Sequence, residues 1–445
     1  MKLAGWGNYP VVEGTLLGCS DRRAATQATQ GSNTLITRGN GRSYGDPAIN
    51  PDATLSALRL DRLIAFDPST GRLTCEAGLL LADLLAMFVP RGWFPPVTPG
   101  TKFVTIGGMV AADVHGKNHH QVGSFGRHVD QLELLTANGT VMVCSRTQNH
   151  DLFRATIGGM GLTGVILSAS FRMIPIETAW IRQETLVANN LHEVMDFFEQ
   201  AGEWVYSVAW IDCLARGANL GRSLLYCGEH ALIDDLAGDK AQASLAIPTK
   251  RPHTVPFFLP SLALNRFVVR RFNEAYYRRG AAQASSSIVD YDTFFYPLDA
   301  IHDWNRIYGR RGFAQYQCAL PREASRAGLI HIVGRIAEAG TGSFLSTLKL
   351  FGPTEGPHSG LLSFPIEGYT LALDFPINRS TLTLMKELDA IVADHGGRLY
   401  LAKDSRMSRD MMIKGYPGLP EFLRIRNESG AATKFHSEQS RRLAL

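Results

Sequence analysis

The chain has 445 residues, of which 45% are hydrophobic and 19% are charged, and its formal net charge is +4. This length favours two domains, and the composition excludes an intrinsically disordered chain. The small positive charge gives no reason to expect nucleic acid as a partner, although it suits anionic ligands such as phosphates.

The six cysteines form no CxxC pair and have no regular spacing. We therefore expect neither a disulfide framework nor a zinc site, and reduced thiols in a cytoplasmic protein. The N-terminus lacks the apolar core of a signal peptide, and no stretch approaches the roughly 18 apolar residues of a membrane span. Contact with the inner membrane is therefore expected to be peripheral at most.

Short strands joined by glycine turns are expected in the first part of the chain. The pattern predicts a compact apolar helix over 79–88, and strands or paired strands over 34–38, 73–76, 131–145 and 165–173. The paired strands turn at Asn138-Gly139, a dipeptide with a strong preference for tight hairpins.

The composition changes after about residue 177. Aromatic residues cluster in three later stretches, which are 204–210, 257–277 and 291–316. We expect residues 1–176 to form a first domain, residues 177–397 to form a second domain that covers the substrate, and residues 398–445 to return to the first.

Two glycine-rich stretches imitate the dinucleotide-binding fingerprint. Residues 159–164 fit G-x-G-x-x-G, but they follow a helix-like segment and open a strand, which is the reverse of the order that a Rossmann site needs. Residues 39–45 do follow a strand, but Pro47 and Pro51 interrupt the helix that would have to come next. A nicotinamide Rossmann site is therefore not expected.

Three glycine-bearing segments instead suggest another kind of phosphate site. Residues 39–45, 99–108 and 158–164 each lie next to a predicted strand. One such segment would be read as a tight turn, but three within so short a part of the chain favour backbone N–H groups gathered on a buried pyrophosphate.

A polar cluster follows the second of these segments. It contains His115, Lys117, His119 and His120. A metal site would need supporting acidic ligands, and only Asp113 is near in the sequence, so no metal is expected.

The glycine motifs carry a family resemblance. RGNGRSYGD (38–46), TPGTKFVTIGG (98–108), HGKNHHQVGSFG (115–126) and GGMGLTG (158–164) resemble FAD-dependent oxidoreductases of the vanillyl-alcohol oxidase / p-cresol methylhydroxylase superfamily. The similarity is strongest to the polyprenylphosphoryl-ribose oxidases of that superfamily. It continues over nearly the whole chain through FFYPLDAIHDWNRIYG (294–309), KLFGP (349–353), DFPI (374–377) and GGRLYLAKDSR (396–406).

The resemblance implies an α+β fold. Residues 1–176 would form a two-subdomain PCMH-type FAD-binding domain that residues 398–445 complete. Residues 177–397 would form a mainly antiparallel-sheet substrate domain with flanking helices. Related sugar-lactone oxidases carry a flavin-linked histidine where this chain has Arg42, so FAD is expected to bind non-covalently.

The implied reaction oxidises the C2 hydroxyl of a polyprenylphosphoryl-β-D-ribose to the 2-keto sugar. A partner short-chain dehydrogenase/reductase would then complete an epimerisation to arabinose, for cell-wall or glycolipid biosynthesis. Ala372 and Phe295 stand where the mycobacterial pattern has cysteine and tyrosine. An FAD-dependent oxidase of a free alditol, aldonolactone or nucleotide-linked sugar therefore remains an alternative. A non-catalytic flavin-binding scaffold is disfavoured by the charged residues that are retained.

The resemblance also implies the site residues. FAD would contact the glycine motifs and their neighbours, namely Arg38, Gly39, Asn40, Gly41, Arg42, Ser43, Tyr44, Pro99, Gly100, Thr101, Thr105, Gly107, Gly108, Ala112, His115, Gly116, Gly161, Thr163 and Lys403. The substrate would contact Lys117, Trp210, Phe295, Gln317, Lys349 and Lys403. The catalytic residues would be Lys403, His115 and Tyr44, and the sequence does not rank them as the base.

The roles of Lys403, Lys349 and Gln317 can also be considered from the sequence pattern around them. Without the resemblance, Lys403 is a surface lysine paired with Asp404; with it, the ammonium lies at the flavin N1–O2 edge and stabilises negative charge there. Lys349 alternates with apolar residues, and an inward lysine needs an anionic or hydroxylic partner. Gln315 and Gln317 share a strand face, and the resemblance favours Gln317 as the inward one.

The stretch 249–280 is both basic and aromatic. It is either a disordered or mobile loop over the active site, or a surface that meets lipid and the phosphate of a polyprenyl substrate. A mobile loop that faces the membrane is the favoured interpretation.

Overall fold

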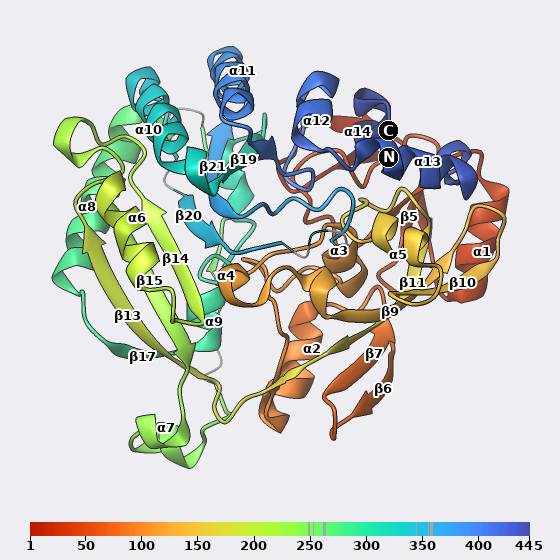
Figure 1. Ribbon diagram of the computed structural model, residues 1–445, viewed down its shortest axis with the longest axis horizontal. Coiled ribbons are helices and arrows are strands. Elements are labelled where there is room, and N and C mark those ends of the chain that lie inside the picture. The colour runs from red at the N-terminus through yellow and green to blue at the C-terminus, as the bar shows by residue number, and fades with distance from the viewer. Residues whose placement is uncertain (248–249, 252, 261–263, 344, 355, 357–358) are drawn as a thin grey trace.

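The computed structural model contains residues 1–445 and describes all of them apart from 248–249, 252, 261–263, 344, 355 and 357–358. In Figure 1 the N-terminal and C-terminal parts of the chain lie together on one side, and a large sheet with its helices lies on the other. None of the helices in the described part combines the length and apolar character needed to cross a bilayer. The six cysteines are buried free thiols.

A small parallel sheet begins the fold. Its strands, in the order β3-β5-β4, are β3 (Leu16–Gly18), β5 (Thr54–Ser56) and β4 (Ile36–Arg38). Helix α1 (Arg22–Gly31) joins β3 to β4, and the Asp21 side chain caps it by accepting from the Ala24 N–H at 2.8 Å. No helix occurs between β4 and β5, where every residue is described, so the first glycine-rich stretch lacks the following helix that a Rossmann site needs.

A five-stranded antiparallel sheet follows, in the order β10-β9-β11-β7-β6. The strands are β6 (Leu63–Asp67), β7 (Arg72–Glu76), β9 (Val129–Leu135), β10 (Val141–Ser145) and β11 (Val165–Arg172). The predicted hairpin is confirmed: Val141 pairs with Leu135, and Gly139 takes φ +84° in the turn. Helices α2 (Leu81–Phe88), α3 (Ile106–Ala111) and α5 (His150–Thr156) lie in the same part of the chain, as does the short α4 (His119–Val122), which instead packs against β20 (Ser346–Phe351).

The largest sheet has eight strands in the order β17-β13-β15-β14-β20-β21-β19-β22, and all its pairs are antiparallel. The strands are β13 (Trp180–Ala188), β14 (Tyr206–Ile211), β15 (Ser223–His230), β17 (Ser287–Asp290), β19 (Phe313–Pro321), β20 (Ser346–Phe351), β21 (Gly368–Pro376) and β22 (Arg398–Leu399). The expected α+β class with a mainly antiparallel second sheet is therefore correct.

Helices cover both faces of this sheet (Figure 1). They are α6 (Leu191–Gln200), α8 (Arg266–Ala282), α9 (Tyr291–Phe295), α10 (Arg322–Ala339) and α11 (Arg379–Asp394). On one face Leu320 and Tyr369 meet α10 and α6: a Cβ on Gly328 would lie 2.6 Å from Leu320, and the Phe198 and Tyr369 rings lie 5.7 Å apart. The strands alternate, so their remaining side chains face the opposite way, toward the glycine-rich loops.

Shorter elements complete the chain. The short strands are β1 (Lys2–Ala4), β2 (Val11–Glu13), β8 (Trp93–Phe94), β12 (Ile174–Pro175), β16 (His253–Thr254) and β18 (Ile301–His302). The remaining helices are α7 (Asp239–Gln242), α12 (Arg409–Gly415), α13 (Leu419–Glu428) and α14 (Glu438–Leu443), with short 3-10 turns at η1 (Val89–Arg91), η2 (Phe125–His128), η3 (Gly217–Asn219), η4 (Ile233–Asp235), η6 (Trp304–Tyr308) and η8 (Ala431–Thr433).

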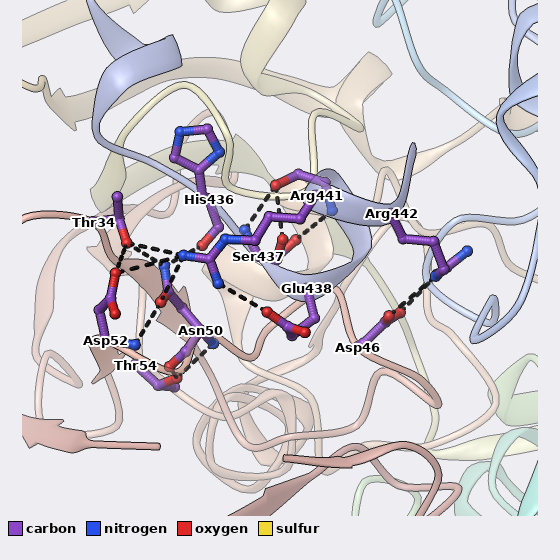
Figure 2. A network of polar contacts seen from close by, with 11 residues as sticks. Thr34, Asp46, Asn50, Asp52, Thr54, His436, Ser437, Glu438, Arg441 and Arg442 are labelled. Atoms are coloured by element: carbon purple, nitrogen blue, oxygen red, sulfur yellow. Dashed lines mark hydrogen bonds and ion pairs between the residues drawn. The ribbon is translucent and has the colours of Figure 1, made fainter. Parts of the chain in front are cut away.

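The C-terminal segment lies against the start of the chain. Leu35 and Phe435 form a parallel bridge, and both belong to one small apolar cluster. Figure 2 shows the polar network beside it, in which Arg442 donates to Asp46 at 2.8 Å. The same guanidinium donates to Asp404 at 2.8 Å. The domain limits at 176 and 397 stay predictions, and β22 at the start of the last segment is still a strand of the eight-stranded sheet.

The stretch 249–280 differs from the expected loop over its second half. Residues 266–282 form α8, whose Asn273 is fully buried and donates to Asp212 at 2.8 Å. Tyr276 of the same helix lies 4.7 Å from the ring of Trp210 on β14. Aromatic side chains therefore hold this helix on the sheet. Residues 249, 252 and 261–263 of the stretch lie outside the described residues.

Candidate active site

The first glycine-rich loop follows β4 and lies against the second. A Cβ on Gly39 would stand 2.3 Å from Oγ1 of Thr105. Asn40 donates from Nδ2 to the Phe103 carbonyl at 2.8 Å. Because the close approach leaves no room for a side chain, Gly39 presents bare backbone where the two loops meet.

The same loop continues through a left-handed turn. Gly41 has φ +65°, and a Cβ there would stand 2.3 Å from the Arg38 guanidinium. Arg38 itself donates to the Ala4 carbonyl at 2.8 Å. The Arg42 guanidinium lies 4.1 Å above the ring of Trp6, and its buried Nε has no partner among the described residues. A ligand oxygen beside this loop would satisfy that donor.

The second glycine-rich segment opens α3. Thr105 caps the helix by accepting from the Gly108 N–H at 3.2 Å, and a Cβ on Gly107 would stand 2.7 Å from the Ala77 side chain. Gly100, after Pro99, is different, since a Cβ there would meet no described atom within 4 Å. The backbone of the segment is therefore packed against the core at Gly107 and open at Gly100.

Residues that follow α9 form hydrogen bonds with this segment. Asp299 accepts from Thr101 Oγ1 at 2.7 Å and from the Lys102 N–H at 2.8 Å. Thr98 and the Tyr296 hydroxyl form a further hydrogen bond. These bonds fix loop 98–108 from the side opposite to the five-stranded sheet.

The third glycine-rich segment lies in the core. Gly161 has φ +77°, and the Thr163 hydroxyl pairs with that of Thr156 at 2.9 Å. Thr163 is 1% exposed. The backbone of this segment, rather than the Thr163 side chain, is therefore the part that remains for a cofactor.

Several residues that are predicted to contact FAD are held in place through their backbone atoms. The Tyr44 N–H donates to the Ala402 carbonyl at 3.0 Å, and the Ser43 carbonyl accepts from the Trp6 N–H at 2.8 Å. The Ala112 carbonyl accepts from the Tyr400 hydroxyl at 2.8 Å. A Cβ on Gly116 would stand 2.6 Å from Asn118.

His115 lies at the centre of the site, and its proton position follows from its neighbours. The Thr370 hydroxyl donates to the Cys318 carbonyl at 2.8 Å, so it accepts from Gln317 Nε2 at 3.2 Å. The other hydrogen on Gln317 Nε2 then points to His115 Nε2 at 3.0 Å. We infer that His115 is neutral and carries its proton on Nδ1, in keeping with burial and the charge of Lys349, which lower its pKa well below the ordinary value.

This tautomer limits what His115 can do. Its Nε2 lone pair is already used, and its Nδ1–H is a buried donor with no partner among the described residues. The ring is therefore suited to donate a hydrogen bond to a ligand oxygen and poorly suited to accept a proton. Of the three base candidates, His115 is disfavoured.

Two half-buried lysines, Lys349 and Lys403, act on His115, and a third, Lys117, lies close to Lys349. Burial lowers the pKa of Lys349 to about 8, and burial together with the charge of Lys349 lowers the pKa of Lys117 to about 7. Lys117 donates to the Phe294 carbonyl and lies 4.1 Å from that ring. Lys403 Nζ lies 3.8 Å above the ring of Tyr44. Burial thus disfavours the charged form of all three lysines, and an anionic ligand would favour it.

A carboxylate missed at the sequence level completes the site. Asp374 is 1% exposed and accepts from Gln315 Nε2 at 2.7 Å. Strand register explains the arrangement, because Gln315 pairs with Asp374 and Gln317 with Ala372 across β19 and β21. Both glutamines therefore point inward, and the prediction of Gln317 as the single inward one was too narrow. The period of two along β21 could have placed Asp374 on this face.

Two predicted substrate residues lie in aromatic clusters. Trp210 faces Tyr276, as described above, and shares its sheet face with Lys349 because Trp210 pairs with Thr347. Phe295 is 2% exposed and lies 4.8 Å from the Tyr206 ring. Phe295 therefore packs among the aromatic side chains next to Lys117. The structure brings together Tyr44, His115, Lys117, Gln317, Lys349 and Lys403. Phe295 borders this group, since the Lys117 ammonium lies 5.8 Å from its ring centroid, and Trp210 and Thr163 lie in other clusters.

Comparison with known proteins defines the class. Residues 22–145 match a family model described as an FAD binding domain. The glycine cradle, the open backbone at Gly100 and the unpartnered donors on His115 and Arg42 fit a cofactor with phosphate and carbonyl oxygens. The chain is therefore an FAD-dependent oxidoreductase.

Similar proteins identify the family to which the chain belongs within this class. The chain is 38% identical to decaprenylphosphoryl-beta-D-ribose oxidase of Mycolicibacterium smegmatis over 100% of this chain and 97% of that protein. It is 36% identical to an uncharacterized protein of Streptomyces coelicolor over 82% of this chain and all of that protein. L-gulonolactone oxidase of Bos taurus is 31% identical over 39% of each chain. The chain belongs to the decaprenylphosphoryl-β-D-ribose oxidase family.

Proposed function

We propose that this enzyme oxidises the C2 hydroxyl of a polyprenylphosphoryl-β-D-ribose to the 2-keto sugar, as the first half of an epimerisation to arabinose. The observation that carries the proposal is the group of half-buried lysines Lys117, Lys349 and Lys403, of which Lys403 alone is acted on by a carboxylate, Asp374, in the described part of the chain. Buried cations need anionic partners. A phosphodiester-linked sugar supplies such a charge, whereas a free alditol or aldonolactone does not.

The chain's residues would divide the work. FAD, when bound, supplies the acceptor for the hydride that leaves C2. Lys403 would stabilise negative charge at the flavin edge, His115 would donate a hydrogen bond through Nδ1, and Lys117 or Lys349 would contact the phosphate. The hydroxyl proton leaves as the ketone forms, and because Lys403 acts here as an ammonium, Tyr44 is the base candidate that remains. Arg38, Gly39, Gly41, Thr105 and Gly108 would hold FAD non-covalently.

The alternative is an FAD-dependent oxidase of a free alditol, aldonolactone or nucleotide-linked sugar. It is favoured by the small side chain of Ala372, which is partly exposed on the inward face beside Gln317. The partial match to L-gulonolactone oxidase also supports this alternative.

Substrate choice separates the two functions. Under anaerobic conditions we expect a polyprenylphosphoryl ribose to bleach the flavin absorbance, and the same lipid without its phosphate to have an apparent affinity at least about tenfold weaker, since a charge-assisted hydrogen bond contributes about 1.5–3 kcal/mol. Stopped-flow absorbance measures both. Bleaching by L-gulonolactone or an alditol, with none by the lipid, would establish the alternative.

The product and the substrate also suggest partners. The 2-keto sugar must be reduced at the same carbon to give arabinose, so we propose a separate short-chain dehydrogenase/reductase as the second enzyme. A polyprenyl substrate resides in a membrane, so we propose peripheral contact with the cytoplasmic face of the inner membrane. Helix α8 supports this contact, since Phe267, Val268 and Phe272 on it are exposed beside five arginines.

Removing the exposed apolar side chains of α8 should weaken membrane binding. We expect the triple variant Phe267→Ser, Val268→Ser, Phe272→Ser to bind vesicles of anionic phospholipid at least tenfold less tightly, because each buried apolar side chain contributes about 1.5–3 kcal/mol. Co-sedimentation with liposomes measures this. Substitution keeps Asn273 and its core contact, which a deletion of the segment would lose.

A matched control lies on β6, whose Leu63 and Ile64 are 43% and 49% exposed. The double variant Leu63→Ser, Ile64→Ser should bind the same vesicles as the unmodified enzyme does. Equal loss in both variants would mean that α8 is not the membrane-binding surface.

A further inference from the structure

Asp374 is a buried carboxylate on the sheet face that carries Lys349, because Lys349 pairs with Thr370, four residues before Asp374 on β21. It lies on β21 at the position paired with Gln315, and its own N–H donates to Ser343 Oγ at 3.1 Å. Its carboxylate accepts from Gln315 Nε2 at 2.7 Å and, more weakly, from the Tyr308 hydroxyl at 3.5 Å. These donors are neutral. No arginine or lysine lies within ion-pair distance of Asp374 among the residues that the structure describes.

The neighbouring acidic residue has a different role. Asp404 follows Lys403 directly, but its carboxylate is bound by Arg442 at 2.8 Å and by Gln439 at 3.2 Å. It therefore serves the contact between the C-terminal segment and the start of the chain. This geometry also removes the simple interpretation of Lys403 as a surface lysine paired with Asp404. Lys403 lies in a turn bound to β19, because the Tyr400 N–H donates to the Gln317 carbonyl at 3.0 Å and the Lys403 N–H donates to the Tyr400 carbonyl at 3.0 Å. Asp374 is held by Gln315, two residues from Gln317 on the same strand, so its charge acts on Lys403.

The groups around Lys403 come from three elements, and they have opposing effects on its protonation. Lys349 on β20 repels the ammonium, and Asp374 on β21 attracts it. Tyr44 from the first glycine loop offers its ring face, which favours a cation. His115 is neutral, and Gln315 and Tyr308 carry no charge. Burial and Lys349 therefore both favour loss of the proton from Lys403, and Asp374 is the principal charge that keeps it.

We propose that Asp374 is a positioning residue that holds Lys403 in its protonated form, while Gln315 and Tyr308 fix the carboxylate in place. The proposal rests on the proposed function only through the role of Lys403 at the flavin, and it does not depend on which sugar is oxidised. Burial raises the pKa of Asp374 and lowers that of Lys403, and each partner's charge opposes the other's shift.

The direction of the pH effect follows from the charge. A lysine is protonated below its pKa, so removing the Asp374 carboxylate should make Lys403 lose its proton at lower pH. We expect Asp374→Asn to move the inflection in the flavin reduction potential, measured against pH with a reference dye, down by about 1–3 pH units. The alkaline limb of kcat should move by the same amount, and Asp374→Glu should restore both.

The reduction potential needs no sugar, so it distinguishes this proposal from the proposed function. If the lipid substrate fails but the inflection moves, the role of Asp374 stands and the substrate is wrong. A matched control is Asp389→Asn, since Asp389 is another buried carboxylate, bonded to Arg406 at 2.6 Å and close to Tyr316 on the opposite face of the sheet. It should lower stability without moving the inflection. An Asp374→Asn enzyme that holds FAD and keeps the unmodified inflection would overturn the proposal.

Discussion

Lys403→Met is expected to slow anaerobic reduction of the bound flavin by about 10²–10³-fold, which is the usual cost of removing one charge-stabilising donor from an active site. Methionine keeps much of the length and apolar contact of lysine above the Tyr44 ring, so the loss would reflect the charge. Stopped-flow absorbance with the lipid substrate measures the rate. The FAD content and the melting temperature should stay close to those of the unmodified enzyme.

A control for this variant is available nearby. Lys414 lies on α12 and is exposed, so Lys414→Met removes the same charge from the molecule without touching the site. Its reduction rate should be unchanged. If Lys403→Met reduces at the unmodified rate, Lys403 stabilises no charge in the reaction and Tyr44 becomes the leading catalytic candidate.

Arg442→Ala is expected to lower the free energy of unfolding by about 3–5 kcal/mol, because it leaves buried carboxylates without their partner. Figure 2 shows the Arg442 guanidinium bound to Asp46. The same guanidinium also binds Asp404, and the side chains of Asp46 and Asp404 are only 4% and 2% exposed. Urea unfolding followed by circular dichroism measures the change. The variant should also lose FAD more readily, because Asp46 ends the first glycine-rich motif.

The adjacent arginine provides the control. Arg441 pairs with Glu438 and Asp52, whose side chains are 31% and 54% exposed. Exposed pairs contribute about 0–1 kcal/mol, so Arg441→Ala should be nearly as stable as the unmodified enzyme. Equal loss from the two variants would mean that burial of the carboxylates does not set the cost.

Local patterns in the sequence were sufficient to predict much of the structure of the first domain. Asn138-Gly139 fixed a hairpin, and Pro47 and Pro51 excluded a helix after the first glycine loop, because both depend only on backbone preferences of nearby residues. Cofactor and family followed from long motifs, which the family model and the full-length relative confirm.

Features that depend on strand register were not predictable to the same extent. Which strand lies beside which, and so which carboxylate faces Lys403, is decided by pairing between segments far apart in the chain. In the sequence Asp374 belongs to the DFPI motif, and nothing near it along the chain shows that it faces Lys403. The surroundings of Phe295 were missed similarly, since its neighbours Tyr206 and Phe94 come from two other strands. The residues assigned to FAD and substrate stay predictions.

The bridge between Leu35 and Phe435 bears on how the protein is made. The Lys434 ammonium donates to the Ser32 carbonyl across a sequence separation of 402 residues, and Phe435 fills an apolar cluster with Leu35 and Leu55. A ribosome makes about 5–20 residues per second, so the first strands wait for tens of seconds before their last neighbours emerge. We expect the nascent chain to keep this apolar surface uncovered throughout that interval, as a site for chaperones, and to bind FAD firmly only once its final helices have docked.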